Sequence, residues 1–359
     1  MITISLCMIV RNEEDTLERC LSSASSVADE IIVVDTGSED RTKEIAARFT
    51  DKVYDFEWID DFSAARNFSY SQAGMDYILW LDADDIILPE DAVRLKHLKE
   101  TIPPDIDTVM MRYNTGFDAH GRVVFSYFRE RLSKRNSNYR WREPVHEYFE
   151  AGGKRLNADI CITHAKPHGR AGKRNIQIYE RSIAEGKDLT PRGMYYYARE
   201  LKGHERYNDA INWFSLFLDT RKGWVEDNIS ACGELASCYL AENKPAEALS
   251  AMLRSFDYDT PRAEICCQMG ACFKEQGKYK QAAFWYELVL KLEKDDSRWG
   301  FRLEDCWGYI PCIELAVCYD KLGDYKKAAL FNEMAAGYKP GSAAVLHNKK
   351  YFENMLMGN

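Results

Sequence analysis

Residues 77–85 read Tyr77-Ile-Leu-Trp-Leu-Asp82-Ala-Asp84-Asp85, so that a short apolar run passes directly into a group of carboxylates. A bounded apolar run of this length predicts a buried β-strand. Ligands of open α/β sheets bind outside the carboxyl ends of the strands. The stretch therefore predicts a sheet with a polar site at its edge.

The sequence on either side alternates strand-like and helical segments. Short β-rich runs occupy residues 2–10, 30–35, 53–56 and 77–82. Helical patterns lie between them, at residues 13–25, 41–49 and 63–73. Alternation of this kind implies βαβ units and a mostly parallel, Rossmann-like sheet. Beyond residue 100 the pattern is less regular, and we expect a mixed extension of the sheet from residues 108–113, 122–127, 145–149 and 158–163.

From about residue 190 onward the chain has helical patterns that repeat. Residues 235–239, 269–273 and 315–319 match one another in pattern, and the first two segments are 34 residues apart, which is the tetratricopeptide period. Small residues recur at a spacing of 12 and would let two helices of a hairpin approach closely. Four units are predicted, with a capping helix after them and a loop at 297–309: residues 191–224, 229–262, 263–296, 309–342 and, for the cap, 347–356.

These patterns divide the chain into two domains. Residues 1–168 form the predicted α/β domain, residues 169–190 a linker or connecting helix, and residues 191–359 the all-α repeats. The basic, glycine-bearing stretch at residues 166–173 is either a lid over a bound diphosphate or an ordinary linker. Helical repeats form a concave groove that suits an extended peptide or protein, or self-association of the chain.

Composition excludes several classes of protein. The 359 residues carry a net charge of −9, which argues against a nucleic-acid-binding surface. No apolar run approaches the roughly 20 residues of a membrane-spanning helix, and the N-terminus does not resemble a signal peptide. The 11 cysteines contain no Cys-x-x-Cys pair, so we expect reduced thiols in a cytoplasmic protein.

Polar residues also follow the first two predicted strands. Asn12 and Glu13 come after the first strand, and Asp35 and Asp40 lie at the end of the second. Any one of these side chains could simply cap the next helix, but several at one sheet edge favour a shared ligand. Asp82 and Asp84 would project to the same side of an extended backbone, where two carboxylates suit Mg²⁺ or Mn²⁺. The alternative is a solvated acidic turn.

Four motifs in order resemble the family 2 glycosyltransferases, which have the GT-A fold. They are Ser5-Leu-Cys-Met-Ile-Val-Arg-Asn12-Glu13, Ile-Val-Val34-Asp35-Thr-Gly-Ser38-Glu-Asp40, Phe62-Ser-Ala-Ala-Arg66-Asn67 and Trp80-Leu-Asp82-Ala-Asp84-Asp85. The resemblance covers about residues 1–165. Combined with the repeats, it is similar to bacterial peptide and protein glycosyltransferases of the sublancin S-glycosyltransferase type, and to transferases that act on lipopolysaccharide core.

The resemblance implies roles for individual residues. The nucleotide sugar would contact Val10, Asn12, Glu13, Asp35, Arg66, Asp82 and Ala83. Asp35 would accept a hydrogen bond from the nucleobase, Arg66 would lie along the nucleotide, and Asp82 would face the ribose. The metal ion, Mn²⁺ or Mg²⁺, would bind Asp84, and a late histidine that many GT-A enzymes place on the metal corresponds to His164.

An inverting transfer also needs a general base that deprotonates the acceptor. Glu147 is the candidate by resemblance, and His146 is the alternative because a histidine base suits neutral pH. A structural polar pair is the competing interpretation of both residues. The Gln-x-x-Arg-Trp sequence of the family is absent, which argues against a processive polysaccharide synthase.

The function expected from the sequence is a metal-dependent, inverting glycosyltransferase. Its donor would be a nucleotide sugar, usually a UDP-sugar in such enzymes, and its acceptor a peptide or protein held partly by the repeats. The alternatives are a glycan acceptor, or a repeat-based adaptor with a degenerate transferase domain. A nucleotidyltransferase is disfavoured because residues 5–14 lack a glycine-rich phosphate loop.

Overall fold

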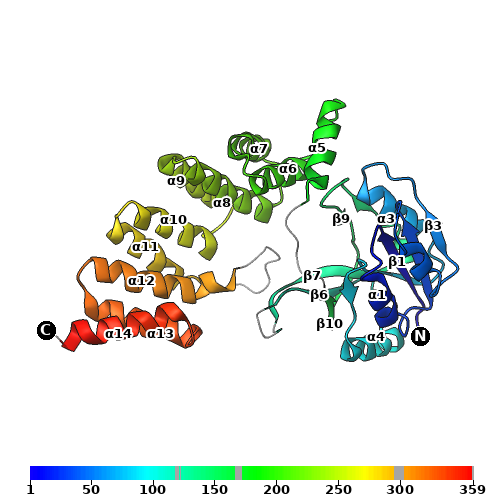
Figure 1. Ribbon diagram of the computed structural model, residues 1–359, viewed down its shortest axis with the longest axis horizontal. Coiled ribbons are helices and arrows are strands. Elements are labelled where there is room, and N and C mark those ends of the chain that lie inside the picture. Colours follow the sequence, from blue (N-terminus) through cyan, green and yellow to red (C-terminus); the bar gives the residue numbers. More distant parts are fainter. Residues whose placement is uncertain (118–120, 122, 166–171, 295–302, 358–359) are drawn as a thin grey trace. The chain divides into compact units, whose positions relative to one another are not determined.

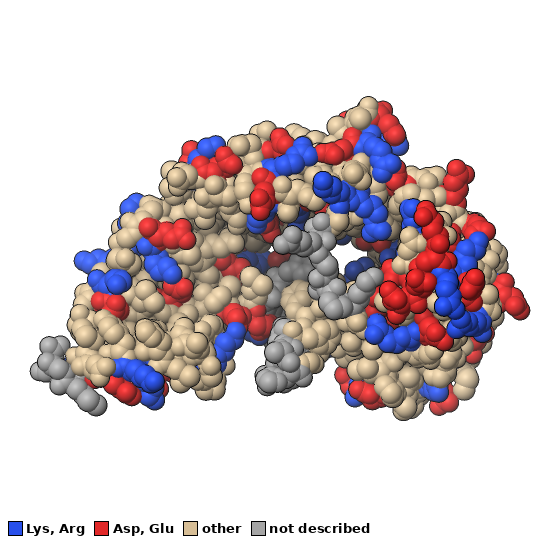
Figure 2. All heavy atoms as spheres, in the orientation of Figure 1, with Lys and Arg blue, Asp and Glu red and all other residues tan. Residues whose placement is uncertain are grey.

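The chain forms two compact units, Met1–Gly186 and Lys187–Asn359 (Figure 1). The computed structural model describes residues 1–117, 121, 123–165, 172–294 and 303–357. The first residue of the strand predicted at 122–127, most of the basic stretch at 166–173 and half of the loop predicted at 297–309 therefore lie outside the described residues. On the face shown in Figure 2, acidic and basic side chains are interspersed over both units.

Unit 1 is built on a mixed sheet with the strand order β3-β2-β1-β4-β7-β6-β10-β5. Its strands are β1 (Ile4–Val10), β2 (Glu30–Asp35), β3 (Val53–Asp55), β4 (Tyr77–Trp80), β5 (Asp85–Ile86), β6 (Thr108–Phe117), β7 (Val123–Lys134) and β10 (Arg155–His164). β1 runs parallel to both β2 and β4, and β2 runs parallel to β3, as the βαβ pattern predicts. β7 is antiparallel to β4 and β6, which makes the predicted mixed extension.

Helices cover both faces of the parallel part of this sheet. Leu6, Met8 and Val33 pack with residues of α1 (Leu17–Ala24), α2 (Thr42–Ala46) and α4 (Pro89–Thr101). Cys7 and Ile32 point to the other face, against α3 (Phe62–Ser71). Because each strand is apolar on both sides, it can be buried between these two layers.

The helix α4 is absent from the sequence prediction. Its start carries recognisable signals, because Pro89 occupies the first turn and the acidic residues Glu90 and Asp91 follow it. Proline lacks the backbone N–H that a first turn leaves unpaired, and acidic side chains interact favourably with the helix N-terminus. These residues would have been sufficient to predict the helix.

The strand predicted at residues 145–149 is wrong in its first part. β8 (Trp141–Arg142) and β9 (Tyr148–Phe149) form a short antiparallel pair, and residues 143–147 form the loop between them. His146 has a φ of 53° and Glu143 a φ of 75°, in the left-handed region that a strand does not use. Residues 145–147 therefore belong to the loop and do not extend β9.

Unit 1 ends with α5 (Arg174–Ala184), in the segment expected to be a linker or connecting helix. Ile176, Ile178 and Tyr179 are buried. The Tyr179 hydroxyl donates to the carbonyl of Val145 over 3.3 Å. The contacts of α5 thus place it within unit 1.

Unit 2 consists of helical hairpins with the predicted repeat. Its helices are α6 (Pro191–Gly203), α7 (Tyr207–Thr220), α8 (Val225–Ala241), α9 (Pro245–Arg254), α10 (Ala263–Glu275), α11 (Tyr279–Val289), α12 (Tyr309–Lys321), α13 (Tyr325–Tyr338) and α14 (Ala343–Met357). Successive pairs from α6 to α13 pack together, and α14 packs on α13 where the capping helix is predicted. No helix in the described part of the chain combines the length and apolarity needed to cross a membrane.

Small residues at the hairpin contacts explain why this periodicity folds as it does. Ala236 and Ala248, from α8 and α9, are both buried, as are Ala316 and Ala328 in a later pair. A Cβ atom on Gly270 would lie 2.7 Å from the ring of Tyr286. The cysteines at the repeated position (Cys238, Cys272 and Cys318) are likewise buried, which fits packing rather than chemistry.

Candidate active site

A pocket of about 360 Å³ lies in unit 1 at the carboxyl ends of the strands. It is lined by Ile9, Val10, Arg11, Glu13, Thr36, Trp58, Phe62, Arg66, Asp82, Ala83, Asp84, Val145, His146, Glu147, His164, Arg174 and Asn175. Residues from the ends of β1, β2, β4 and β10 thus meet at one place, as expected for an open α/β sheet. The start of α3 with the segment before it, the loop before β9 and the first turn of α5 complete the lining.

The acidic segment after β4 folds as a turn. The backbone N–H of Asp85 donates to the carbonyl of Asp82 over 3.0 Å, and the N–H of Asp82 donates to Oδ2 of Asp85 over 3.0 Å. The expectation that an extended backbone aligns Asp82 and Asp84 is therefore wrong. Both side chains nevertheless line the pocket, because the turn carries them to its wall.

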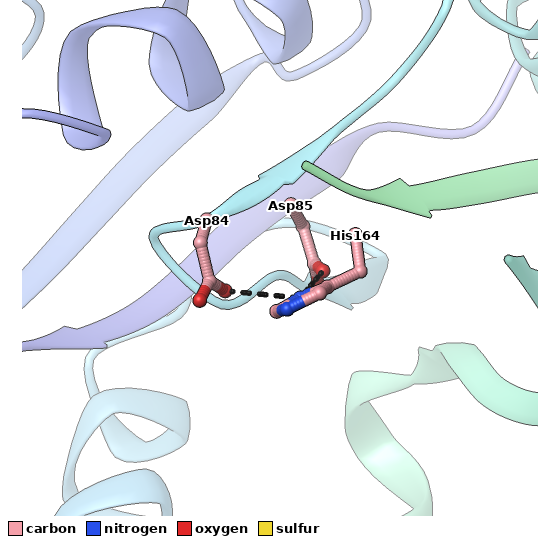
Figure 3. Close-up of side chains that lie close together, drawn as sticks. All are labelled: Asp84, Asp85 and His164. Carbon is pink, nitrogen blue, oxygen red and sulfur yellow. Dashed lines mark ion pairs between the residues drawn. The ribbon is translucent and has the colours of Figure 1, made fainter. Parts of the chain in front are cut away.

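The same turn brings Asp84 and Asp85 to His164 at the end of β10 (Figure 3). One possible ligand atom from each of the three residues lies within 4.8 Å of the others. Nδ1 of His164 is 3.5 Å from Oδ1 of Asp84 and 3.8 Å from Oδ1 of Asp85. The two carboxylates raise the pKa of His164 to about 10, so without another cation the imidazolium balances their charge.

Asp85 is already saturated by protein groups. Its side chain is fully buried, Oδ2 accepts from Nη1 of Arg131 over 2.9 Å, and Oδ1 accepts from the hydroxyl of Tyr113 over 2.8 Å. The Arg131 guanidinium lies 3.8 Å from the ring centre of Trp80 and 4.3 Å from that of Tyr113. Asp85 therefore shapes the turn from inside the core.

Asp84 and His164 remain as ligands that face the pocket. A carboxylate oxygen and an imidazole nitrogen are ligands that Mn²⁺ accepts, and carboxylate with water suits Mg²⁺. The residues present thus fit a divalent cation, which would supply the positive charge that the His164 proton supplies without it.

Arg66 joins the two acidic sides of the pocket. From α3, its Nη2 donates to Oδ1 of Asp82 over 2.7 Å and its Nε donates to Oε1 of Glu147 over 2.8 Å. The guanidinium packs against the rings of both Trp80 and Trp141, at 5.1 and 4.7 Å from their centres. Burial opposes the charged form of Asp82, but the nearby arginines outweigh it and lower the pKa of that carboxyl.

Both candidates for the general base line the pocket. Glu147 is largely buried and is held by Arg66, whereas His146 occupies the left-handed backbone position in the preceding loop. Arg66 and Glu147 are 81 positions apart in sequence, so no local pattern could have paired them.

The remaining residues expected to bind the nucleotide lie around the loops after β1 and β2. Val10, Glu13 and Ala83 line the pocket, whereas Asn12 and Asp35 lie outside that lining. The Asn12 side chain accepts from the N–H of Glu39 over 2.8 Å and so ties the two loops together. Oδ2 of Asp35 accepts from the N–H groups of Gly37 and Ser38. Its Oδ1 is buried without a hydrogen-bond partner among the described residues.

Asp40 fits the alternative interpretation, in which the side chain only caps the next helix. Its Oδ1 accepts from the N–H of Thr42, the first residue of α2, over 2.9 Å.

Several residues of the site are absent from the sequence prediction. Trp58, Arg174 and Asn175 line the pocket, and Arg131 holds the acidic turn from the core. Phe62, which belongs to the third motif but had no predicted role, lines it as well. A lone arginine in a strand carries no signal of its partner. For Arg174, the local signal was the basic segment at residues 166–173, which directly precedes it.

Comparisons with known proteins find a match in each of the two units. Residues 5–156 match glycosyl transferase family 2, and residues 263–296 match a tetratricopeptide repeat. A TPR repeat-containing protein of Synechococcus elongatus is 40% identical over 150 residues, which are 42% of this chain and 36% of that protein. The SPbeta prophage-derived glycosyltransferase SunS of Bacillus subtilis is 25% identical over 233 residues, which are 61% of this chain and 54% of SunS. The chain thus spans about half or less of the length of these relatives.

Proposed function

We propose that this chain, which carries a family 2 glycosyltransferase domain and tetratricopeptide repeats, transfers a sugar from a nucleotide sugar to a peptide or protein acceptor. The observation that carries the proposal is the pocket at the strand ends, where Asp84 and His164 lie beside the carboxylates that Arg66 joins. The transfer would invert the anomeric centre and depend on Mn²⁺ or Mg²⁺.

The loops after β1 and β2 would receive the nucleotide. The unpaired Oδ1 of Asp35 supports a hydrogen bond from the N–H of a nucleobase, because a buried acceptor without a partner costs free energy. The N–H groups of uracil, thymine and guanine all meet this requirement, so it is compatible with a UDP-sugar, the usual donor of such enzymes, and equally with a TDP- or GDP-sugar. Val10, Glu13 and Ala83 would line the path from the base toward the acidic turn.

The sugar end of the donor would lie by the acidic turn. Asp84 and His164 would hold the cation, which would balance the charge of the diphosphate leaving group. Asp82 would face the ribose, with Arg66 keeping its carboxylate ionised and in place. Arg66, which itself lines the pocket, would lie along the nucleotide and would also act on it through Asp82.

Glu147 is the proposed general base, with His146 as the alternative. The Arg66 guanidinium binds Oε1 of Glu147, and among the described residues no partner is bonded to Oε2. That oxygen would take the acceptor proton while the acceptor attacks the anomeric carbon. The ion pair holds the carboxylate in one orientation, which favours proton transfer at a defined position.

The repeats support a peptide or protein acceptor. Within unit 2, a second pocket of about 390 Å³ lies between α7, α8 and α9. Tyr239, Glu247 and Arg254 line it, so it offers aromatic, acidic and basic side chains to an extended chain.

Donor hydrolysis tests the proposal. Purified protein with UDP-sugars and Mn²⁺ should release UDP, and Asp84→Ala should lower the rate at least about 100-fold because a cation ligand is lost. Asp51→Ala, which removes an exposed carboxylate that does not line the pocket, is the matched control and should behave like the unmodified chain. Equal turnover by Asp84→Ala would defeat the cation assignment.

A further inference from the structure

Two arginines that line the pocket have no role in the function proposed above. Arg11 follows β1, and Arg174 is the first residue of α5. Both side chains are exposed. Among the described residues, neither guanidinium forms a hydrogen bond or an ion pair, so both are available to a ligand.

Contacts between α5 and the segment before α3 hold Arg174 in position. Nη1 of Arg181, two turns further along α5, lies 2.6 Å from Oδ2 of Asp60. Asp60 in turn accepts from the indole N–H of Trp58 over 2.8 Å. The Arg174 guanidinium lies 4.6 Å from the ring centre of Phe62. The aromatic ring orients the cation without satisfying its hydrogen-bond donors.

Charge around the pocket favours an anion beside these arginines. Asp82 and Glu147 form ion pairs with Arg66, whereas among the described residues no carboxylate forms an ion pair with Arg11 or Arg174. Partial burial of the guanidinium lowers the pKa of Arg174; the charges of Glu147 and Glu13 oppose this shift, and that of Arg11 adds to it. Two like charges in one pocket are unfavourable unless an anion compensates them. A planar guanidinium binds two phosphate oxygens at once.

We propose that Arg174 and Arg11 bind the diphosphate of the donor, an inference that rests on the proposed function. During transfer, the acceptor atom bonds to the anomeric carbon, and the bond from that carbon to the phosphate oxygen breaks with its electron pair. The acceptor proton passes to the general base, and the diphosphate gains one negative charge. Arg174 and Arg11 stabilise that charge together with the cation.

Residue Arg174 lies beyond residues 5–156, which match the family. The donor site of this chain is therefore completed by a helix outside that match. A fragment that ends before α5 would lack Arg174.

Calorimetric titration with nucleotides tests the inference. UDP, GDP, CDP, ADP and dTDP are titrated in the presence of Mn²⁺, together with the matching monophosphates, into the unmodified chain, Arg174→Ala, Arg11→Ala, Arg174→Lys and Lys173→Ala. The diphosphate that binds should lose about 10-fold or more in affinity with either alanine variant at an arginine. Arg174→Lys should restore part of the affinity, because it keeps the charge but not the planar fork.

The control variant separates binding from folding. Lys173 is exposed and adjacent to Arg174 but does not line the pocket, so Lys173→Ala should bind like the unmodified chain. Monophosphate affinity should change less than about twofold in all variants, because a misfolded pocket would lose both ligands.

Each other outcome has a distinct meaning. Full diphosphate affinity in Arg174→Ala overturns the inference and leaves the proposed function standing. Equal losses for diphosphate and monophosphate also overturn it, because they indicate a structural effect. If none of the nucleotides binds the unmodified chain, the proposed function fails, and the inference fails with it.

Discussion

At the scale of single residues, buried charges in unit 1 are compensated by partners distant in sequence. Glu30 begins β2 with a side chain only 5% exposed. It accepts hydrogen bonds from Ser5, Lys52 and the N–H of Gly74. Burial opposes the charged form of Glu30, but these donors outweigh it and lower its pKa below 4.5. One carboxylate thus ties β1, β2 and the segment before β4 together.

The free energy of unfolding should consequently depend on the protonation of Glu30. Because its pKa is lower in the folded chain than in the unfolded chain, the stabilisation is present above the unfolded value. It is lost as the pH falls through the folded value. Glu30→Gln should be less stable than the unmodified chain near pH 7, and the difference should shrink below about pH 4.5.

Urea unfolding at several pH values measures this effect. Glu39→Gln is the control, because Glu39 is exposed and its side chain has no partner among the described residues. A difference between Glu30→Gln and the unmodified chain that stays constant down to pH 3 would contradict the assignment.

At the scale of elements, the helical hairpins depend on small residues where two helices meet. Gly270 of α10 faces the buried ring of Tyr286 in α11, and an added Cβ atom would approach the ring to 2.7 Å. Gly337 of α13 has no atom within 4 Å of such a Cβ. The same substitution should therefore have opposite consequences at the two positions.

Gly270→Ala should lower the free energy of unfolding by about 1–3 kcal/mol, because overpacking forces the hairpin apart. Gly337→Ala should raise it by up to about 1 kcal/mol, because alanine favours the helix and meets no obstacle. Chemical denaturation monitored by far-UV circular dichroism compares the two variants. Stabilisation by Gly270→Ala would show that the Tyr286 ring moves aside freely.

At the scale of the whole molecule, the chain has two units with separate cores. The site proposed for the donor and the cation lies entirely within Met1–Gly186. A ligand that binds only the folded form of one unit stabilises that unit and leaves the other unchanged. Scanning calorimetry should therefore show two transitions that respond differently to ligands.

Addition of UDP and Mn²⁺ at about 100 times the dissociation constant should stabilise unit 1 by about 2.7 kcal/mol. For a domain of this size, that corresponds to an upward shift of roughly 5–10 °C in one transition. Removal of the cation with a chelator should reverse the shift, and Asp84→Ala should reduce it. Equal movement of both transitions would show that the units unfold together.

Much of the architecture was predictable because local patterns encode it. The strands β1 to β4 and the helices between them follow from alternating apolar runs, and the repeats follow from small residues at constant spacing. The place of the site follows from Asp82 and Asp84 at a strand end, since parallel strands share one carboxyl edge. These features depend on residues close together in the chain.

Only the tertiary structure decided how the charges are paired. Arg66 joins Asp82 to Glu147, Arg131 occupies Asp85 from the core, and α5 brings Arg174 to the pocket. The sequence by itself determined the α/β domain, the helical repeats and the acidic turn. The partners of each buried charge depended on which distant segments the fold brings together, because a charge inside a protein needs a close partner and no local pattern specifies one.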